Sequence, residues 1–293
     1  MPAAVPPYNE SMPELPEVET IARGVNERLR GDRIVDLWFS RYPQPFKVPA
    51  ARQAKGLQGC AILAVHRAGK HIVCELGPAA GRPLDEREDR AAAQWIVHLG
   101  MTGRLLVTAP EAPLAPHTHA RLFMASGREL RFVDPRRFGR LEYRDLSCCP
   151  GFRASGFDPL TVTAEEFVRL FRGRKLAIKA ALLNQKLLSG VGNIYADESL
   201  FHAGIRPRRP AGRLTRAELD RLRKALVQVL EHAIRLGGSS VSDYVDAEGV
   251  RGFFQLEHCV YLRTGLPCRR CLTPIRRILV TGRGTHYCLH CQK

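Results

Sequence analysis

The pattern of apolar residues changes once along the chain, and this change limits the fold more than any other feature of the sequence. From Arg33 to about Arg144, short runs rich in Val, Ile and Leu alternate with turn residues, which is typical of antiparallel strands. Beyond Pro159, apolar residues recur with the period of amphipathic helices. The sequence therefore predicts an α+β protein whose N-terminal part is an antiparallel β-sandwich or barrel.

A helix is predicted before the strand-rich segment, because apolar residues there have helical spacing and a glycine follows them. These residues are Val18, Ile21, Val25, Leu29 and Gly31. The stretch 147–160 is rich in Gly, Pro and Ser, so we place a linker there. The polar, charged stretch 78–93 is expected to be a loop between two strands.

The helical segment includes one long helix with clear ends. Thr215 is the expected N-cap, Glu218 completes a capping box three residues later, and Gly237 is the expected stop. Residues 161–258 are thus expected to form a mostly helical domain, and 259–293 a small cysteine-bearing module.

Four cysteines near the C-terminus predict one structural Zn²⁺. Two C-x2-C pairs separated by sixteen residues, on turns joined by a hairpin, can close a tetrahedron of thiolates with no open position for catalysis. The ligands are Cys268, Cys271, Cys288 and Cys291. His286 and His290 lie inside the module and are expected to be exposed bystanders, although either could compete as a ligand. The other cysteines, Cys259 among them, are interpreted as buried thiols or bystanders.

The charge of the chain favours a polyanionic partner. Lys and Arg number 45 against 29 Asp and Glu, for a net charge of +16. A basic protein in which Arg replaces Lys on solvated faces has the same balance. No apolar run is long enough to cross a membrane and no secretory signal pattern begins the chain, so we expect an intracellular, cytoplasmic and nucleoid-associated protein with no membrane partner.

Five stretches together resemble the formamidopyrimidine-DNA glycosylase family, from Pro13 to Lys293. They are "PELPEVET", "HLGMTG", "DPRRFG", "NQKLLSGVGNIYADESLFHAGIRP" and the four-cysteine C-terminus. The resemblance implies a catalytic β-sandwich domain with flanking helices at 13–146, a helix-two-turn-helix DNA-binding domain at 161–258 and a zinc-finger hairpin at 259–293. It also implies a monomer that acts on double-stranded DNA. Such enzymes excise oxidised purines such as 8-oxoguanine and formamidopyrimidines, then cleave the strand at the abasic site by β,δ-elimination.

The resemblance assigns the nucleophile to Pro13. A terminal proline carries a secondary amine, whereas an internal proline is an amide whose lone pair is delocalised. Pro13 is internal in this sequence, so residues 1–12 are expected to be an extension or a mis-assigned start, with Met12 as the initiator or 1–11 as a removable leader. Two other interpretations stay open: Pro2 becomes the terminal residue, or the protein binds lesions without cutting.

The resemblance carries further roles to matching residues. Glu14 would be the acid or base at the sugar, Lys70 would serve β-elimination, and Arg283 would hold phosphate and assist δ-elimination. Extrusion of a base leaves a gap in the duplex, which Met101, Arg136 and Phe138 would fill. The DNA backbone would be held by residues His117, Arg174 and Asn193, and neighbouring N–H groups at a helix start near Asn193 would face phosphate.

Several of these residues also have an ordinary structural interpretation. Glu14 could serve a helix dipole, Lys70 could be a strand-end lysine, and Met101 or Phe138 could simply pack. Gly237 to Gln255 resembles the lesion-contacting loop of the family. Two alternative functions remain: a zinc-stabilised DNA-binding protein without catalysis, and the sister branch that excises oxidised pyrimidines, whose start usually differs from "PELPEVE".

Overall fold

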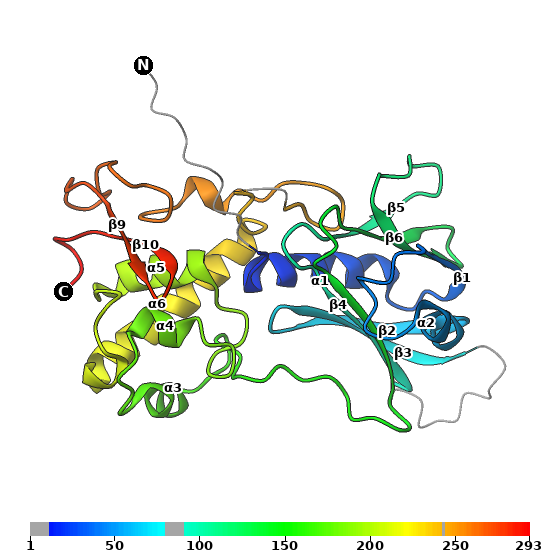
Figure 1. Ribbon diagram of the computed structural model, residues 1–293, viewed down its shortest axis with the longest axis horizontal. Helices are drawn as coiled ribbons and strands as arrows, with labels where there is room; N and C mark the ends of the chain where they lie inside the picture. The colour runs from blue at the N-terminus through cyan, green and yellow to red at the C-terminus, as the bar shows by residue number, and fades with distance from the viewer. Residues whose placement is uncertain (1–11, 80–90, 242–243) are drawn as a thin grey trace, which may run out of the picture. The chain divides into compact units, whose positions relative to one another are not determined.

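The computed structural model describes residues 12–79, 91–241 and 244–293 (Figure 1). Packing of the backbone divides them into two compact units. The first unit contains Pro13, Glu17–Arg153 and Ser240–Gly252. The second contains Glu14–Pro16, Ala154–Ser239 and Phe253–Lys293. The chain therefore enters and leaves each unit more than once, which no local sequence signal indicates.

The first unit contains two antiparallel four-stranded sheets, as expected for a β-sandwich. One sheet has the order β2-β3-β4-β8 and the other β1-β6-β7-β5. Inward-facing residues of both sheets and of the first helix share one apolar core, in which Trp95, Leu122 and Phe132 are at most 1% exposed. The strands are β1 (Ile34–Phe39), β2 (Cys60–Ala68), β3 (His71–Ala79), β4 (Ala93–His98), β5 (Arg104–Thr108), β6 (Thr118–Met124), β7 (Glu129–Val133) and β8 (Arg140–Asp145).

Helix α1 (Leu15–Leu29) confirms the helix predicted at this position. Its predicted apolar stripe is completely buried, and Gly31 follows it with φ of +83°. Sequence patterns missed helix α2 (Ala50–Leu57) and strand β2. The buried face of α2 includes the polar Gln53, which binds backbone and Trp95 Nε1, and β2 has two register shifts against β3.

The second unit is helical, as predicted. It contains α3 (Ala164–Phe171), α4 (Ile178–Leu182), α5 (Asn193–Ala203) and α6 (Arg216–Arg235), with short 3-10 helices η1 (Ala211–Arg213) and η2 (Phe254–Leu256). Both Thr163 and Thr215 close capping boxes, and Gly237 follows α6 with φ of +74°. Nine of the eleven residues of α5 are buried, so this helix forms the centre of the unit.

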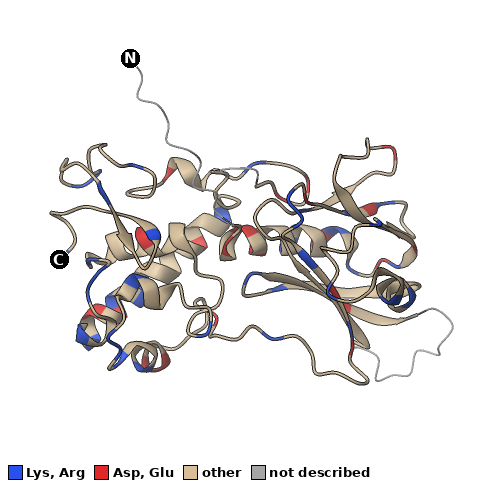
Figure 2. Ribbon diagram, in the orientation of Figure 1, with Lys and Arg blue, Asp and Glu red and all other residues tan. Residues whose placement is uncertain are grey.

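The C-terminal module is a hairpin of β9 (Arg276–Val280) and β10 (Arg283–Tyr287). An apolar cluster attaches the module to α5 through Phe201, Val260 and Ile275 together with two of the cysteines. Lys and Arg are spread over both units (Figure 2). No described helix is long and apolar enough to cross a membrane.

Some predictions lie outside the described residues. The expected extension 1–12 falls there except for Met12, as does 80–90 of the expected loop 78–93. The stretch resembling the lesion-contacting loop is described except for residues 242 and 243.

Candidate functional site

Glu14 lies at the N-terminus of α5 within the second unit. Its carboxylate accepts hydrogen bonds from the backbone N–H groups of Ile194 (3.1 Å) and Tyr195 (3.4 Å), and Glu14 as a whole is 2% exposed. Two first-turn N–H groups and the positive end of the helix dipole therefore favour its negative charge. The carboxylate is fixed in place by the main chain of a segment 180 residues away.

The glycines of "GVGNIY" make room for this contact. A Cβ on Gly192 would lie 2.2 Å from the Glu14 carboxyl carbon, far inside van der Waals distance. Gly190 has φ of +91° and accepts the Leu15 N–H at 3.0 Å, which holds the chain beside Glu14. The backbone N–H groups that were expected to face phosphate at this helix start thus bind the carboxylate of Glu14.

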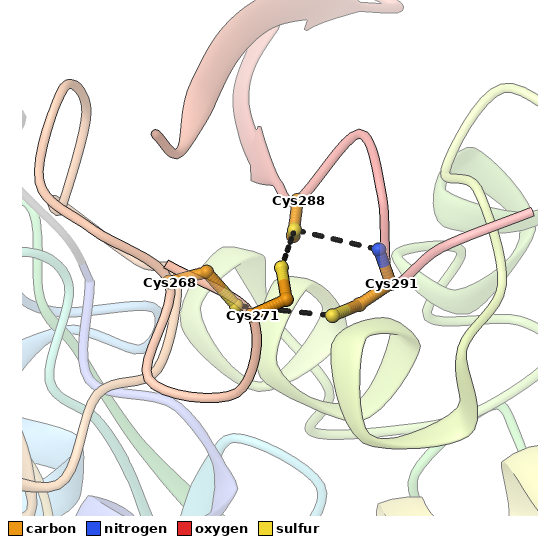
Figure 3. Close-up of side chains that lie close together, drawn as sticks. All are labelled: Cys268, Cys271, Cys288 and Cys291. Atoms are coloured by element: carbon orange, nitrogen blue, oxygen red, sulfur yellow. Dashed lines mark hydrogen bonds between the residues drawn. The ribbon is translucent and has the colours of Figure 1, made fainter. Parts of the chain in front are cut away.

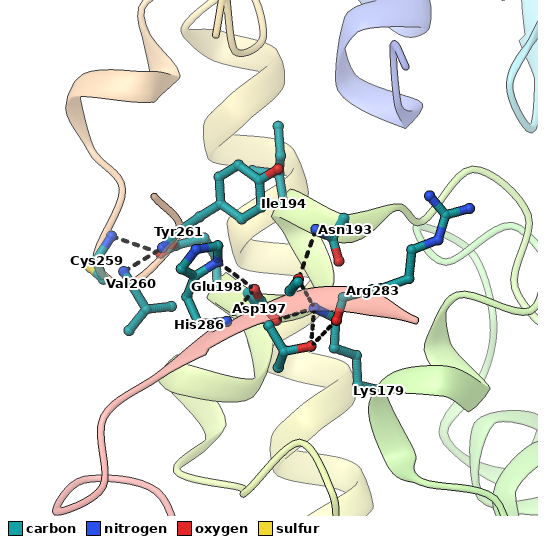
Figure 4. A network of polar contacts seen from close by, with 12 residues as sticks. Lys179, Asn193, Ile194, Asp197, Glu198, Cys259, Val260, Tyr261, Arg283 and His286 are labelled. Carbon is teal, nitrogen blue, oxygen red and sulfur yellow. Dashed lines mark hydrogen bonds and ion pairs between the residues drawn. The ribbon is translucent and has the colours of Figure 1, made fainter. Parts of the chain in front are cut away.

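The side chain of Asn193, the first residue of α5, contacts the C-terminal hairpin. Its side-chain amide donates to the carbonyl of Gly284 in β10 at 3.0 Å (Figure 4). The two N–H groups that follow it in α5, those of Ile194 and Tyr195, donate to Glu14. Among the described residues, Asn193 Oδ1 is buried without a hydrogen-bond partner. Asn193 therefore joins the start of α5 to the hairpin that carries Arg283.

A buried network that sequence patterns missed supports this hairpin (Figure 4). The Lys179 ammonium lies 2.7 Å from Asp197 Oδ1 and donates to the carbonyl of Gly284 and to Thr285 Oγ1. Burial lowers the pKa of Lys179, while Asp197 and, more weakly, Glu14 oppose that shift. A lysine on the apolar face of "LAIKAALL" was the available signal, since such a residue is buried only when it is paired.

The expectation that His286 is exposed is wrong. His286 is 1% exposed, its backbone N–H donates to Asp197 Oδ2 at 2.8 Å, and its Nδ1 lies 3.2 Å from the same oxygen. These contacts bury the His286 ring against α5, on which β10 packs. His290 is exposed, as expected.

Arg283 is exposed at the start of β10, next to Gly284. The Gly284 carbonyl accepts hydrogen bonds from both Lys179 and Asn193, which anchors the main chain next to the exposed Arg283. Glu14, Asn193 and Arg283 thus come from three distant segments and meet in one region of the second unit.

In the first unit, Lys70 lies in the turn between β2 and β3 and is half-buried. The next residue, His71, packs on His98 with ring centroids 4.8 Å apart. Burial, with smaller contributions from His71 and Lys70, lowers the pKa of His98 to about 4. His98 is neutral at pH 7, and its Nδ1 accepts the N–H of Gly100 in "HLGMTG".

The two motifs expected to fill the DNA gap lie against each other. A Cβ on Gly100 would meet the backbone of Phe138 and Gly139 at 2.6 Å, so only glycine permits this approach. The completely buried Asp134 accepts from Thr102 Oγ1 (2.6 Å) and from the N–H of Gly139 (2.7 Å).

This packing places three expected gap-filling residues together. Met101 follows Gly100 directly, and the Arg136 guanidinium lies 4.9 Å from the centre of the Phe138 ring. Phe138 is 48% exposed. Part of the Phe138 ring therefore faces solvent beside the Arg136 guanidinium.

The remaining predicted DNA contacts are on the surface. His117 is exposed, with φ of +64°, and its carbonyl accepts the Asp134 N–H at 3.0 Å, which places it beside the Phe138 turn. Arg174 is exposed in the second unit after α3, within the basic stretch 172–175. Its Nε donates to the carbonyl of Leu170 at 2.5 Å.

The four predicted zinc ligands converge (Figure 3). Their sulfur atoms all lie within 4.8 Å of one another, with Cys268 to Cys291 at 3.9 Å and Cys271 to Cys288 at 3.4 Å. A Zn–S bond of about 2.3 Å gives a tetrahedral sulfur separation of roughly 3.8 Å, so the cluster fits one Zn²⁺. Backbone N–H groups of Arg270 and Cys291 point at two of the sulfurs, as is usual around thiolate ligands.

The remaining cysteines do not join this centre. Cys60 and Cys74 are buried, as interpreted from the sequence, whereas Cys148 and Cys149 are exposed and Cys259 is half-exposed. The exposed pair lies in the turn that follows β8.

Three family models match consecutive parts of the chain. They describe the formamidopyrimidine-DNA glycosylase N-terminal domain (residues 12–141), its H2TH domain (156–245) and a zinc finger found in FPG and IleRS (265–293). A formamidopyrimidine-DNA glycosylase of Solibacter usitatus is 43% identical over 96% of this chain and 100% of its own length. The chain belongs to the formamidopyrimidine-DNA glycosylase family. It is therefore a DNA-repair enzyme with a helix-two-turn-helix domain and a structural zinc finger.

Solved structures of the family agree with this assignment. The MutM (Fpg) protein of Thermus thermophilus has a TM-score of 0.80 and 39% identity, covering 96% of this chain and 98% of that one. The Lactococcus lactis Fpg in complex with abasic-site DNA has a TM-score of 0.82 and 32% identity, covering 96% of this chain and 99% of that one. The same bacterial protein has been solved with Fapy-dG DNA and with DNA containing an oxidised pyrimidine.

Proposed function

We propose that this chain is a bifunctional DNA glycosylase and abasic-site lyase that removes oxidised purines, 8-oxoguanine and formamidopyrimidines, from double-stranded DNA. The observation that carries the proposal is the Glu14 carboxylate, held by two backbone N–H groups at the start of α5 and joined covalently to Pro13. A carboxylate fixed beside an imino acid provides the proton transfer that base displacement needs. The names of the relatives and the lesion DNA in the neighbouring structures support the substrate class.

The nucleophile is the nitrogen of Pro13 once its peptide bond to Met12 is absent. An α-amino group has a pKa of roughly 8, so a useful fraction is unprotonated at neutral pH. The nitrogen lone pair bonds to C1′ while the bond from C1′ to the base breaks, and the base leaves with a proton. Loss of the amine proton and opening of the sugar then give an iminium between Pro13 and C1′.

The iminium makes the neighbouring C2′ proton acidic, which permits strand cleavage. Removal of that proton expels the 3′ phosphate in β-elimination, and a second elimination expels the 5′ phosphate. We assign Glu14 to proton transfer at the sugar, Lys70 to the phosphate that leaves first, and Arg283 to the phosphate of the δ step. A guanidinium next to an anchored stretch of main chain suits bidentate contacts with phosphate.

The extruded nucleotide leaves a gap that the first unit fills. We assign Met101 as the apolar wedge, Arg136 as the partner of the orphaned cytosine, and Phe138 as the stacking ring. We assign His117, Arg174 and Asn193 to contacts with the DNA backbone.

The domain roles follow the same assignment. Residues 13–146 form the catalytic domain, 147–160 the linker, 161–258 the DNA-binding domain and 259–293 the zinc finger. The protein acts as a monomer on one DNA duplex.

Borohydride trapping tests the proposal. Borohydride reduces an iminium to a stable amine, so it cross-links the enzyme to DNA only if the covalent intermediate forms. Protein that begins at Pro13 after removal of Met12 is expected to cross-link to 8-oxoguanine and abasic duplexes, whereas protein that keeps residues 1–12 is not. Glu14→Gln should lower the rate of base excision by at least about a hundredfold, and Glu27→Gln, an exposed carboxylate of α1, should leave it unchanged.

Two results would refute the proposal. If neither protein cross-links while both bind duplex DNA, the chain is a DNA-binding protein without this chemistry. If oxidised pyrimidines are excised faster than 8-oxoguanine, the substrate class is that of the sister branch.

A further inference from the structure

A second group of ligand atoms lies in the second unit, apart from the four cysteines. Glu198 and His202 are four residues apart on α5 and so share one face of the helix. Cys259 comes from the segment that follows η2. One carboxylate oxygen, one imidazole nitrogen and the sulfur of these three residues lie within 4.8 Å of one another, and Cys259 Sγ is 3.8 Å from His202 Nε2.

The carboxylate of this group is oriented by the main chain (Figure 4). Glu198 is 1% exposed, and its Oε1 accepts the N–H groups of Val260 (2.9 Å) and Tyr261 (2.8 Å). Its Oε2 accepts the N–H of Cys259 at 2.9 Å, which leaves that oxygen with a further lone pair. Buried carboxylate ligands of metal sites are commonly held by such hydrogen bonds.

The other two ligand atoms are open to solvent. His202 is exposed and Cys259 half-exposed, so an ion can enter from outside.

We propose that Glu198, His202 and Cys259 form a second, exchangeable site for a divalent transition-metal ion, with Zn²⁺ as the fitting ion. Sulfur, imidazole nitrogen and carboxylate oxygen are the ligand types that Zn²⁺ takes, and three protein ligands leave one position for water. One thiolate and one carboxylate balance the charge of the ion. Binding replaces the thiol proton of Cys259 by the metal, so one proton is released to solvent per ion bound.

Metal binding at this site depends on the position of the Arg270 side chain. Its NH2 lies 3.1 Å from His202 Nδ1, so in this conformation Nδ1 accepts and Nε2, which faces Cys259, carries the ring proton. Metal at Nε2 requires the proton on Nδ1 instead, and the guanidinium must then turn away. It already lies 4.5 Å from the Phe201 ring, which gives it a second contact in either state.

Metal content of the folded protein tests the site without reference to activity. Wild-type protein saturated with Zn²⁺ and passed through a desalting column is expected to hold two ions per chain by elemental analysis. His202→Ala and Cys259→Ser should each hold one, and Cys148→Ser, which removes an exposed thiol elsewhere, should hold two. The one ion kept by the first two variants also reports that the zinc finger is folded. One ion in saturated wild type, or two in His202→Ala, would overturn the proposal.

Arg270→Gln supplies an independent test of the geometry. Its amide oxygen can accept from Nδ1–H and so favours the tautomer that binds metal. The variant is expected to bind the second Zn²⁺ at least about fivefold more tightly in a competition titration with a chromogenic chelator. Unchanged or weaker binding would contradict the assigned role of Arg270.

Discussion

Substitution of Gly192 by Ala is expected to release Glu14 from the start of α5. The new Cβ would lie 2.2 Å from the Glu14 carboxyl carbon, so the carboxylate must retreat by more than about 1 Å to reach normal contact distance. Its hydrogen bonds of 3.1 and 3.4 Å cannot survive that movement. Gly192 itself has φ of −129°, which alanine adopts without strain, so the effect acts through Glu14 alone.

The magnitude follows from the lost interactions. Two hydrogen bonds from helix N–H groups to a carboxylate contribute about 2–3 kcal/mol to the stability of the second unit. The melting transition is therefore expected to fall by roughly 5–10 °C in differential scanning calorimetry. The rate of base excision should fall at least about a hundredfold, as for Glu14→Gln, because a displaced carboxylate no longer has a fixed position.

A double-mutant cycle separates this cause from others. In a Glu14→Ala background there is no carboxylate to displace, so Gly192→Ala should lower the free energy of unfolding by less than about 0.5 kcal/mol. An equal cost in both backgrounds, or wild-type stability and excision rate in the single variant, would refute the reasoning.

Three further perturbations have defined outcomes. Asp134→Ala removes the acceptor shared by Thr102 and Gly139, and should destabilise the first unit by about 2–4 kcal/mol in urea denaturation. A loss below about 1 kcal/mol would mean that other contacts hold the segments of Thr102 and Gly139 together. Burial lowers the pKa of His258 to about 4. Between pH 6.5 and 4 the unfolded chain therefore binds a proton at His258 that the folded chain excludes. The free energy of unfolding should fall by about 2–3 kcal/mol as the pH is lowered through this window. His258→Gln should show a correspondingly smaller decrease, and an equal one would remove His258 as the cause. Chelation of Zn²⁺, or Cys288→Ser, should abolish the folded hairpin and weaken DNA binding at least about tenfold by fluorescence anisotropy, whereas undiminished binding would show that the zinc finger does not hold DNA.

The sequence predicted those parts of the structure that depend on short-range patterns. The stripe of α1, the capping box at Thr215 and the spacing of the four cysteines each lie within a short segment, and each was confirmed. The strands were found for the same reason, except β2, whose register shifts disturb its alternation.

The rest depends on contacts between distant segments. Glu14 was predicted as a functional carboxylate, but its attachment to α5 requires packing across 180 residues of chain. The pairing of Lys179 with Asp197 arises from the packing of α4 on α5, and the burial of His286 from the packing of β10 on α5. A charged residue within an apolar run, such as Lys179, signals that a partner exists without identifying it.

Peptide mapping of the borohydride-trapped complex tests the central claim most directly. The enzyme is trapped on an 8-oxoguanine duplex, digested with protease and nuclease, and sequenced by tandem mass spectrometry. The account predicts that the reduced sugar adduct lies on the N-terminal nitrogen of a peptide beginning Pro13-Glu14. An adduct on a lysine side chain such as that of Lys70, or an adduct in a chain that still carries Met12, would contradict it.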